Sequence, residues 1–591
     1  MSGAALLRSA SIFILLVAAP VRPARGQVSD TAKDSLRASV SLYHSIAPFT
    51  VVPDIDGAEE DLWRLAQLRG ASTARSLLRT PSSMMAPLGE SAPAMPWTGA
   101  KWSLVFPRVQ YTHNSAVPFS MDDGAMWAGK GANAEISGGV RLEWNRVQIA
   151  LAPQLIHEQN LALPFYDNLH SGLPYTLPAY RSPYSTIWNI FPYGADVPFR
   201  FGDTSHSYGD PGESFASARL GAVSAGVSTE HERWGPGIQN ALLLSSNAAG
   251  VPRVFVRSAR PLDTCLGAFE FSTFLGRLEE SDYYRSQDAK TDPNAFEHVG
   301  TTSRLLASAA LVWRPKWEPD VSLGLARSVI EERVYRGPIL LRWFDVFANT
   351  GQPDDRSLTD SSFALGRDQL ISLFGRWVLP NDGFEVYFEW LRASMPVSLR
   401  DFLTDPSHSR GYTVGLQWLA PANSHGGAMR VQGEVTNLEQ DASFRYRPIG
   451  SIYTSRVVPQ GYTQRGQSLG AAIGPGSSSQ FLAADYVAPR WSLGMFGERI
   501  RWNEDAHSQT PYPSYKGWCE SDVSLIGGLR GRWIGALGAM SASISTSRRY
   551  NVFFQMFAAC PYKPAEDPGK VVDLHNATLQ VSFEPLVRRV W

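Results

Sequence analysis

The chain has 591 residues with a formal net charge of −1, and charged residues make up only 18% of it. This balance provides no basic surface for nucleic acid, so we expect no nucleic-acid partner. Aromatic residues reach 11%, which is high for a soluble secreted protein and typical of a membrane barrel with aromatic girdles.

Residues 1–26 have the pattern of a secretory signal peptide. Arg8 supplies a positive charge, an apolar run covers 12–19, and the small residues Ala24 and Gly26 stand where signal peptidase cleaves. The apolar run is about half of what a membrane-spanning helix needs, and no later stretch approaches ~18 apolar residues. We therefore expect export through this signal and no transmembrane helix.

Residues 27–95 are predicted to form a small periplasmic helical segment followed by a linker. DSLRASVSLYHSI and EEDLWRLAQLRGASTARSLL have helical spacing, and the second places acidic residues before arginines, as the helix dipole favours. PSSMMAPLGESAPAMP is typical of a Pro/Ser-rich linker. The leucines that recur at helical intervals are Leu62, Leu65, Leu68, Leu77 and Leu78.

From about Trp102 the hydrophobic period changes to two, and we predict strands throughout 96–591. In GANAEISGGVRLEWNRVQIALAPQ, apolar residues from Ala132 to Trp144 alternate with polar ones such as Glu135 and Arg141. A soluble sandwich or propeller also alternates, but its apolar face must be buried by a second layer. Here the polar face carries charges and the apolar face ends in Trp beside short turns, which favours lipid outside and water inside.

The same hairpin plan repeats at 305–325, 375–390 and 412–435. We expect Trp144, Trp313 and Trp418 to face lipid at the periplasmic interface. At roughly 25–30 residues per strand with its loops, the chain holds an all-β, transmembrane antiparallel barrel of about 18 strands (roughly 16–20). The final segment, LQVSFEPLVRRVW, alternates and ends in an aromatic residue, as outer-membrane barrels do, although Pro585 departs from that pattern.

The segment 160–213 is too long and too aromatic for a plain connection. Aromatic faces beside short polar side chains suit sugars, so one interpretation of this segment is a sugar-binding loop. An equally supported interpretation is a loop that only folds into the barrel and narrows it. The RWGPG turn at 233–237 either shares that site or serves only as a rigid folding turn. The residues that we predict to contact polysaccharide are Tyr166, Tyr184, Trp188, Tyr193, Arg200, Arg233, Gln239 and Asn240.

Six motifs in fixed order carry a family resemblance: DVPFRFGDTSHSYGDPGESF (196–215), TEHERWGPGIQNALLLSSNAAGVPRVF (229–255), LGRLEESDYY (275–284), GRWVLPNDGFEVYFEW (375–390), LRDFLTDPSHSRGYTVGLQ (399–417) and GYTQRGQSLGAAIGPGS (461–477). Together they resemble the Wzi-type capsule assembly proteins of Gram-negative bacteria. The resemblance implies an outer-membrane barrel of about eighteen strands, a periplasmic helical segment and lectin-like attachment of capsular polysaccharide. It assigns no sugar ligand residue by residue.

Several polar clusters could be mistaken for catalytic or metal sites. His408 lies near Asp405, Ser407 and Ser409, but the sequence DPSHSRGY is typical of a turn. The acidic run 279–282 could bind Ca²⁺, or be a solvated strand end. Cys519 and Cys560 could form a bridge, and three unpaired thiols, including Cys265, are an equal alternative.

The sequence therefore predicts a non-enzymatic, monomeric protein of the bacterial outer membrane, without cofactor or metal. Its expected partners are membrane lipid and a capsular or other surface polysaccharide. A porin or sugar channel is the main alternative, and a membrane-embedded enzyme such as a lipase is a third.

Overall fold

A computed structural model describes residues 49–50, 55, 57–71, 76–84, 99–163, 188, 194–284, 303–332, 338–348, 366–396, 398–447, 449–509, 521–535, 538–552 and 573–585. The strands of its large sheet, apart from the two-residue β1 (Phe49–Thr50), are β3 (Lys101–Asn114), β4 (Gly131–Trp144), β5 (Val147–Leu151), β6 (Gln154–Glu158), β7 (His206–Asp210), β8 (Phe215–Leu220), β9 (Val223–Ser228), β11 (Arg253–Ser258), β12 (Leu262–Thr264), β13 (Gly267–Leu278), β14 (Arg304–Pro315), β15 (Val321–Glu331), β16 (Arg367–Leu379), β17 (Phe384–Arg392), β18 (Arg410–Leu419), β19 (Ala428–Asn437), β22 (Ser478–Val487), β23 (Trp491–Trp502), β24 (Asp522–Ile534), β25 (Gly538–Tyr550) and β26 (Leu574–Pro585).

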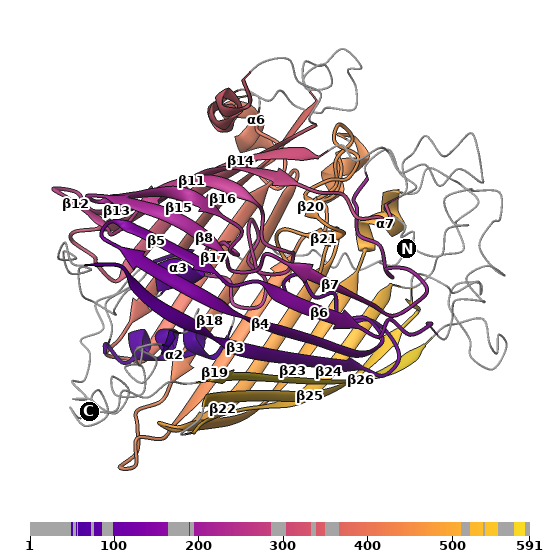
Figure 1. Ribbon diagram of the computed structural model, residues 1–591. Helices are drawn as coiled ribbons and strands as arrows, with labels where there is room; N and C mark the ends of the chain where they lie inside the picture. The colour runs from indigo at the N-terminus through magenta and orange to yellow at the C-terminus, as the bar shows by residue number, and fades with distance from the viewer. Residues whose placement is uncertain are drawn as a thin grey trace, which may run out of the picture.

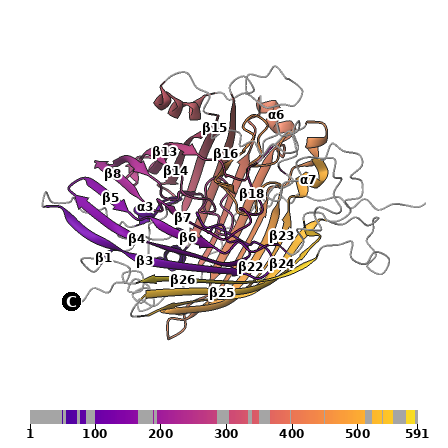
Figure 2. The ribbon, with the colours of Figure 1, turned by 45° about the vertical axis from the view of Figure 1, so that its right-hand side comes forward.

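These strands close into an antiparallel barrel (Figure 1). In three places, two short strands together occupy the position of one barrel strand: β5 with β6, β7 with β8, and β11 with β12. When each of these pairs is counted once, the described residues form an 18-stranded ring. The seam is the pairing of β26 with β3, from Phe583 opposite Val109 to Thr578 opposite Asn114 (Figure 2). The prediction of an antiparallel barrel of about eighteen strands is confirmed.

The period-two pattern decides which side of each strand faces the interior. On β4, Glu135 is 4% exposed and its neighbour Ile136 is 47% exposed. The exposed apolar side chains recur on alternate positions of the other strands, while buried charged and hydroxyl groups take the positions between them. The wall is therefore apolar outside and polar inside, as the sequence predicts.

The two ends of the barrel differ. One end, here called the turn end, carries short connections such as Asn145–Arg146, where Asn145 adopts a positive φ of 55°. The other, the loop end, carries the long connections, including those of η4 (Ile339–Phe347), α6 (Leu399–Thr404), η5 (Ala442–Arg445) and α7 (Glu504–Gln509). Bacterial outer-membrane barrels place short turns in the periplasm and long loops outside the cell.

A helix lies inside the barrel at the turn end. It is α2 (Ala58–Leu68), part of the segment predicted as helical, and it ends before Gly70, whose φ of 65° suits a glycine. Leu77 and Leu78 lie beyond it, and Leu78 belongs to β2 (Leu78–Arg79), so the helical spacing there was misleading. α3 (Pro81–Met84) follows. None of the described helices is both long and apolar enough to cross a membrane.

Two apolar clusters fill much of the interior. Near the turn end, Leu62, Leu65 and Leu68 of α2 pack against inward side chains such as Val378 and Ile534. Nearer the loop end, residues of the β9–β11 and β19–β22 connections pack against the inner wall. These connections fold into the barrel instead of standing above it, and this position brings the candidate site residues inside.

Candidate functional site

The RWGPG segment lies within the barrel. β10 (Arg233–Trp234) pairs with β2, and the Trp234 ring is buried against Phe274 at 5.6 Å. The φ of Gly235 is 107°, and a Cβ there would lie 2.3 Å from a carboxylate oxygen of Glu389, so only glycine fits. The burial of Trp234, whose Nε1 donates to Glu232 at 2.8 Å, favours the folding role for this residue.

Two inward-facing glutamates hold the segment that follows. Glu389 on β17 accepts hydrogen bonds of 2.7 Å from the backbone N–H groups of Gly237 and Leu242. Glu434 on β19 accepts from three consecutive backbone N–H groups at 2.7 to 3.0 Å, those of Ile238, Gln239 and Asn240. Since buried amides need acceptors, the two carboxylates fix the course of residues 237–242.

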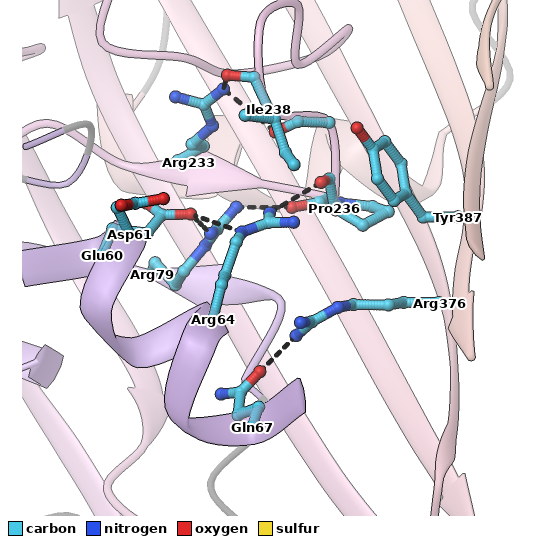
Figure 3. Close-up of polar contacts among 12 residues, drawn as sticks. Glu60, Asp61, Arg64, Gln67, Arg79, Arg233, Pro236, Ile238, Arg376 and Tyr387 are labelled. Atoms are coloured by element: carbon cyan, nitrogen blue, oxygen red, sulfur yellow. Dashed lines mark hydrogen bonds and ion pairs between the residues drawn. The ribbon is translucent and has the colours of Figure 1, made fainter. Parts of the chain in front are cut away.

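The same segment meets α2 from the opposite direction (Figure 3). Arg64 of α2 donates to the carbonyl of Pro236 at 2.7 Å, and Arg79 of β2 donates to the carbonyl of Gly235 at 2.7 Å. Arg64 also pairs with Glu385 of the wall at 3.2 Å. A segment from the loop end and a helix from the turn end are thus joined inside the barrel.

A cavity of about 370 Å³ remains beside this contact and is here called the lumen cavity. Its lining combines the tip residues Ile238 and Gln239 with ion pairs between α2 and the wall, where Asp61 pairs with Arg430 and, at 2.7 Å, with Arg532. Burial disfavours the charged form of Asp61, but the two arginines outweigh it and hold its pKa below the usual range.

A second cavity, here called the outer pocket, lies at the loop end. It has a volume of about 180 Å³ and is formed by the β3–β4, β6–β7, β9–β11 and β19–β22 connections and by the loop-side ends of β23 and β25. Its polar lining includes Asn247, Gln467, Asn503 and Arg549. Its aromatic lining is Phe119, Trp127, Trp188, Phe199 and Trp502.

Polar contacts fix the aromatic rings of the outer pocket. Trp188 donates to Asn503 Oδ1 at 2.7 Å, and Trp502 donates to Ser524 Oγ at 2.8 Å. The guanidinium of Arg549 lies 5.1 Å from the Trp502 ring centre and is itself held by Asp522. A rigid aromatic wall with amide and guanidinium groups can stack against sugar C–H faces and bond sugar hydroxyls.

Asp505 supports the rim of the outer pocket. It accepts hydrogen bonds from the backbone N–H of Gln440 at 2.8 Å and from Ser451 Oγ at 2.7 Å. It also packs beneath Gly476, where a Cβ would come within 2.7 Å of the Asp505 side chain. Burial raises the pKa of Asp505 to about 7, in spite of these hydrogen bonds.

The structure places the predicted contact residues in different regions. Trp188 lines the outer pocket but is only 1% exposed, so it forms the wall and offers little ring surface. Arg200 is buried and donates to the carbonyls of Asn160 and Asp203. The other three lie deeper in the barrel. Gln239 lines the lumen cavity, Arg233 donates hydrogen bonds to the carbonyls of Gly237 and Ile238, and Asn240 Nδ2 donates to Ser479 Oγ.

Tyr166, Tyr184 and Tyr193 lie outside the described residues. The half-buried rings that the outer pocket exposes instead, Trp127 and Trp502, were not among the predicted residues. Trp502 lies at the end of β23, outside the segment 160–213 on which the sequence argument relied. Trp127 lies in the β3–β4 connection, whose aromatic residues are Phe119 and Trp127, so the aromatic density that marked 160–213 is absent there.

The alternative catalytic and metal groups have structural partners. His408 is buried and its Nδ1 lies 3.2 Å from Ser443 Oγ, while Ser409 Oγ is paired with Ser394 Oγ at 2.8 Å. Burial, with Arg447 nearby, lowers the pKa of His408 to about 4. Glu279 pairs with Arg465 at 2.8 Å, and the described residues hold no cluster of three or more metal-binding side chains.

Cys265 lies in an exposed turn as a free thiol, whereas Cys519 and Cys560 lie outside the described residues.

No family model matches the chain, and the curated proteins include no match. Among solved structures, the chain is similar to Wzi of Escherichia coli, described as a carbohydrate-binding β-barrel outer-membrane protein involved in group 1 capsule assembly. The TM-score is 0.50 at 10% identity, over 94% of this chain and 97% of that one. This likeness confirms the predicted resemblance to a Wzi-type barrel at the level of the fold.

Two Pseudomonas aeruginosa structures match with lower TM-scores. OccK8 (OprE) gives a TM-score of 0.38 at 8% identity, over 83% of this chain and 98% of that one. OpdK with vanillate gives 0.36 at 12% identity, over 82% of this chain and 98% of that one.

Proposed function

We propose that the chain is an outer-membrane protein that binds a surface polysaccharide at the outer pocket and so helps to hold the capsule on the cell. The observation that carries this proposal is the aromatic lining of a pocket at the loop end of a barrel whose lumen is crossed by the RWGPG segment and α2. Wzi, which shares the fold, is described as carbohydrate-binding and capsule-related. Export relies on residues 1–26, and the barrel acts as a monomer.

The outer pocket suits a sugar better than it suits an apolar small molecule. Trp127 and Trp502 present partly exposed ring surface, and Asn247, Gln467 and Arg549 surround them with hydrogen-bond donors. Arg549 also provides a positive charge for a uronic carboxylate, although Asp522 neutralises part of it. The rings are already held in place, so binding costs little conformational entropy.

The contacts that join α2 to the RWGPG segment across the lumen argue against the alternative of an open diffusion channel. A solute that passed along the barrel axis would have to disrupt the contacts of Arg64 and Arg79 with the RWGPG carbonyls. It would also meet the two carboxylates that hold residues 237–242. We therefore propose that conduction is not the function, and single-channel recording of the purified protein tests this directly.

The binding proposal is tested with Trp127→Ala, Trp188→Ala and Trp502→Phe in a strain that lacks the parent gene. Each variant should migrate as a folded, heat-modifiable barrel yet retain less surface polysaccharide. Loss of the Trp127 ring, or of part of the Trp502 ring surface, should weaken binding of the purified polysaccharide roughly 2- to 10-fold, about 0.5–1.5 kcal/mol. Trp188→Ala acts indirectly, because the buried Trp188 forms the wall of the pocket and does not stack on the sugar. Trp491→Ala is the matched control, because Trp491 is an exposed ring at the turn end of β23.

Trp502→Phe replaces the indole with a smaller phenyl ring under Arg549 and removes the Nε1 hydrogen bond to Ser524, so it reduces the stacking surface while an aromatic ring stays in place. If the three pocket variants hold polysaccharide as well as Trp491→Ala does, the outer pocket is not the binding site. Arg200→Ala gives a further comparison, since Arg200 supports the β6–β7 connection without lining the pocket.

A further inference from the structure

An arginine stands on the outer face of the barrel wall among residues that face away from the interior. On β15, Leu323, Leu325 and Arg327 share the outer face, whereas Ser322 and Ser328 face inward and are buried. Leu325 is 56% exposed and pairs with the exposed Leu311 and Leu373 of the neighbouring strands. Arg327 occupies the next outward position toward the loop end.

The position of Arg327 along the barrel axis lies within the range of the apolar band. It lies six positions beyond Val321, the first residue of β15 at the turn end. At about 3.3 Å per residue and a strand tilt of roughly 35–45°, that is about 15 Å along the barrel axis. The outward apolar band of such barrels is about 25 Å tall, so an uncovered guanidinium at this position would face hydrocarbon.

The 3-10 helix η4 covers this guanidinium. Arg327 donates to the carbonyl of Val346 at 2.9 Å, to the carbonyl of Ala348 at 2.8 Å and to Gln369 Oε1 at 2.6 Å. Trp343 of η4 donates to Thr273, an outward residue of β13, at 2.8 Å. The polar groups of η4 are therefore turned toward the outer wall of the barrel.

Further contacts hold the same side of η4 against the wall. Val346 is buried against Leu275 and Ala307. Asp345 pairs with Arg367 at 3.0 Å, and Arg367 pairs in turn with Glu331. The charged side chains at this end of β15 and β16 are thus neutralised beneath η4.

The other side of η4 is apolar and exposed. Phe344 and Phe347 are 66% and 75% exposed, which is unusual for rings on a helix that is already packed. The large exposed apolar residues of η4 are Ile339, Leu340, Leu341, Phe344 and Phe347.

α6, from a different loop, repeats the arrangement. Its Phe402 packs edge-on against Trp390 at 6.2 Å and lies 5.6 Å from the guanidinium of Arg392. Trp390 is an outward residue of β17 that pairs with Leu373, in the same row as Leu325. α6 exposes Leu399 and Leu403, and both helices lie at the upper edge of the barrel in Figures 1 and 2.

We propose that η4 and α6 form an apolar collar on the outer wall and that acyl chains of the outer leaflet are its partner. The collar continues the exposed row of Leu311, Leu325 and Leu373, so one lipid phase would cover both surfaces. Backbone carbonyls at the end of η4 cover the outward Arg327, and the Phe402 ring of α6 covers the outward Arg392, so both guanidinium groups are kept from hydrocarbon. This inference rests on the proposed placement of the barrel in a membrane.

The test uses the full chain with Cys265, Cys519 and Cys560 replaced by Ser. A polarity-sensitive fluorophore is attached to Leu341→Cys, Phe344→Cys or Phe347→Cys, and the protein is reconstituted into phosphatidylcholine vesicles. Emission is then quenched with nitroxide on the acyl chain or with aqueous iodide. Leu325→Cys is the control in the apolar band, and Ser424→Cys is the water-facing control in the turn between β18 and β19.

Fluorophores at the collar positions should be quenched by acyl-chain nitroxide as strongly as the fluorophore at Leu325→Cys, and iodide should quench them little. The fluorophore at Ser424→Cys should be quenched by iodide and little by nitroxide. If Leu325→Cys meets lipid but the collar labels are quenched by iodide, the collar is overturned and the membrane barrel stands. Collar labels that neither quencher reaches would also overturn it, because protein, such as a second copy, then covers the surface. If Leu325→Cys also fails to meet lipid, the membrane placement itself is wrong.

Discussion

Glu389 on β17 accepts a hydrogen bond of 2.7 Å from the backbone N–H of Gly237, although 152 residues separate them in sequence. The second carboxylate oxygen accepts from Leu242 at 2.7 Å, so one side chain closes the whole turn. The barrel wall thereby determines the conformation of a loop that would otherwise project from its mouth. The filled lumen follows from this relationship and from its counterpart at Glu434.

Glu389→Gln should loosen the loop without unfolding the barrel. Glutamine has one acceptor oxygen, and its NH₂ group would meet a backbone N–H that also needs an acceptor. Each charged hydrogen bond that is lost contributes about 1.5–3 kcal/mol. Hydrogen exchange of the amides of residues 237–242 should accelerate accordingly.

The control for this change is Glu498→Gln on β23. Glu498 is also buried, but its Oε1 has no hydrogen-bond partner among the residues that the structure describes. The exchange of residues 237–242 should not respond to it. Equal effects of the two substitutions would mean that interior charge, and not the Glu389 hydrogen bonds, holds the loop.

Gly235→Ala should destabilise the folded protein by about 1–3 kcal/mol, because alanine must adopt the positive φ and displace the Glu389 carboxylate. The measurement is the temperature at which the heat-modifiable band disappears. Gly527→Ala adds a methyl group where no atom lies within 4 Å, and should change stability by less than about 0.5 kcal/mol. A similar shift for both variants would contradict the steric argument.

The wall of the barrel was predictable, because a two-residue period is a local property. The alternation around Glu135 and Ile136 indicates which side faces the interior of the barrel before any strand is paired. The number of strands followed from chain length and turn spacing. The seam between β26 and β3 follows in turn, since a closed barrel must join its first and last strands.

The position of the RWGPG segment was not predictable. Its acceptors, Glu389 and Glu434, come from strands that follow it by more than 140 residues, and nothing in the local pattern marks them. α2 was found by its spacing, but its place inside the barrel depends on Asp61 reaching Arg430 and Arg532. The outer pocket likewise joins loops that are far apart in sequence, so Trp127 gave no local sign of its place there.

The order of the outer-pocket rim should depend on pH through Asp505. Its pKa is raised to about 7 by burial, so the folded rim favours the protonated acid. When the rim opens, Asp505 regains its ordinary, lower pKa, so between that value and about 7 it is ionised in the open rim but protonated in the folded one. The stability of the folded rim therefore falls as pH rises through this range, and above about 7 the loss is constant. Proteolytic cleavage near Gln440–Ser451 should therefore be faster at about pH 8 than at about pH 5. Asp505→Asn should abolish this difference.

Asp61→Asn should release α2 from the wall at neutral pH. The Asp61 pKa is lowered, so its stabilising effect is complete at neutral pH and is lost only when the pH falls through that lowered value. The parent should thus stay closed in single-channel recordings from about pH 7 to about pH 5. Loss of a charged hydrogen bond of about 1.5–3 kcal/mol should make openings at least roughly tenfold more frequent.

Asp382→Asn serves as the control for charge at the turn end, because Asp382 is exposed in the turn between β16 and β17. Its recordings should match those of the parent. Openings that increase equally in Asp382→Asn would assign the effect to surface charge and not to α2.

The girdle residues allow a graded test of the lipid-facing surface. Trp144 and Trp418 are exposed at the turn end, and Trp313 stands beside Trp317 at 5.3 Å. Trp144→Arg should cost about 0–1 kcal/mol, since its charge can reach the interface, whereas Leu325→Arg, nearer the middle of the band, should cost about 2–4 kcal/mol. Urea unfolding from vesicles measures both, and equal costs would mean that this face of the wall does not lie in hydrocarbon.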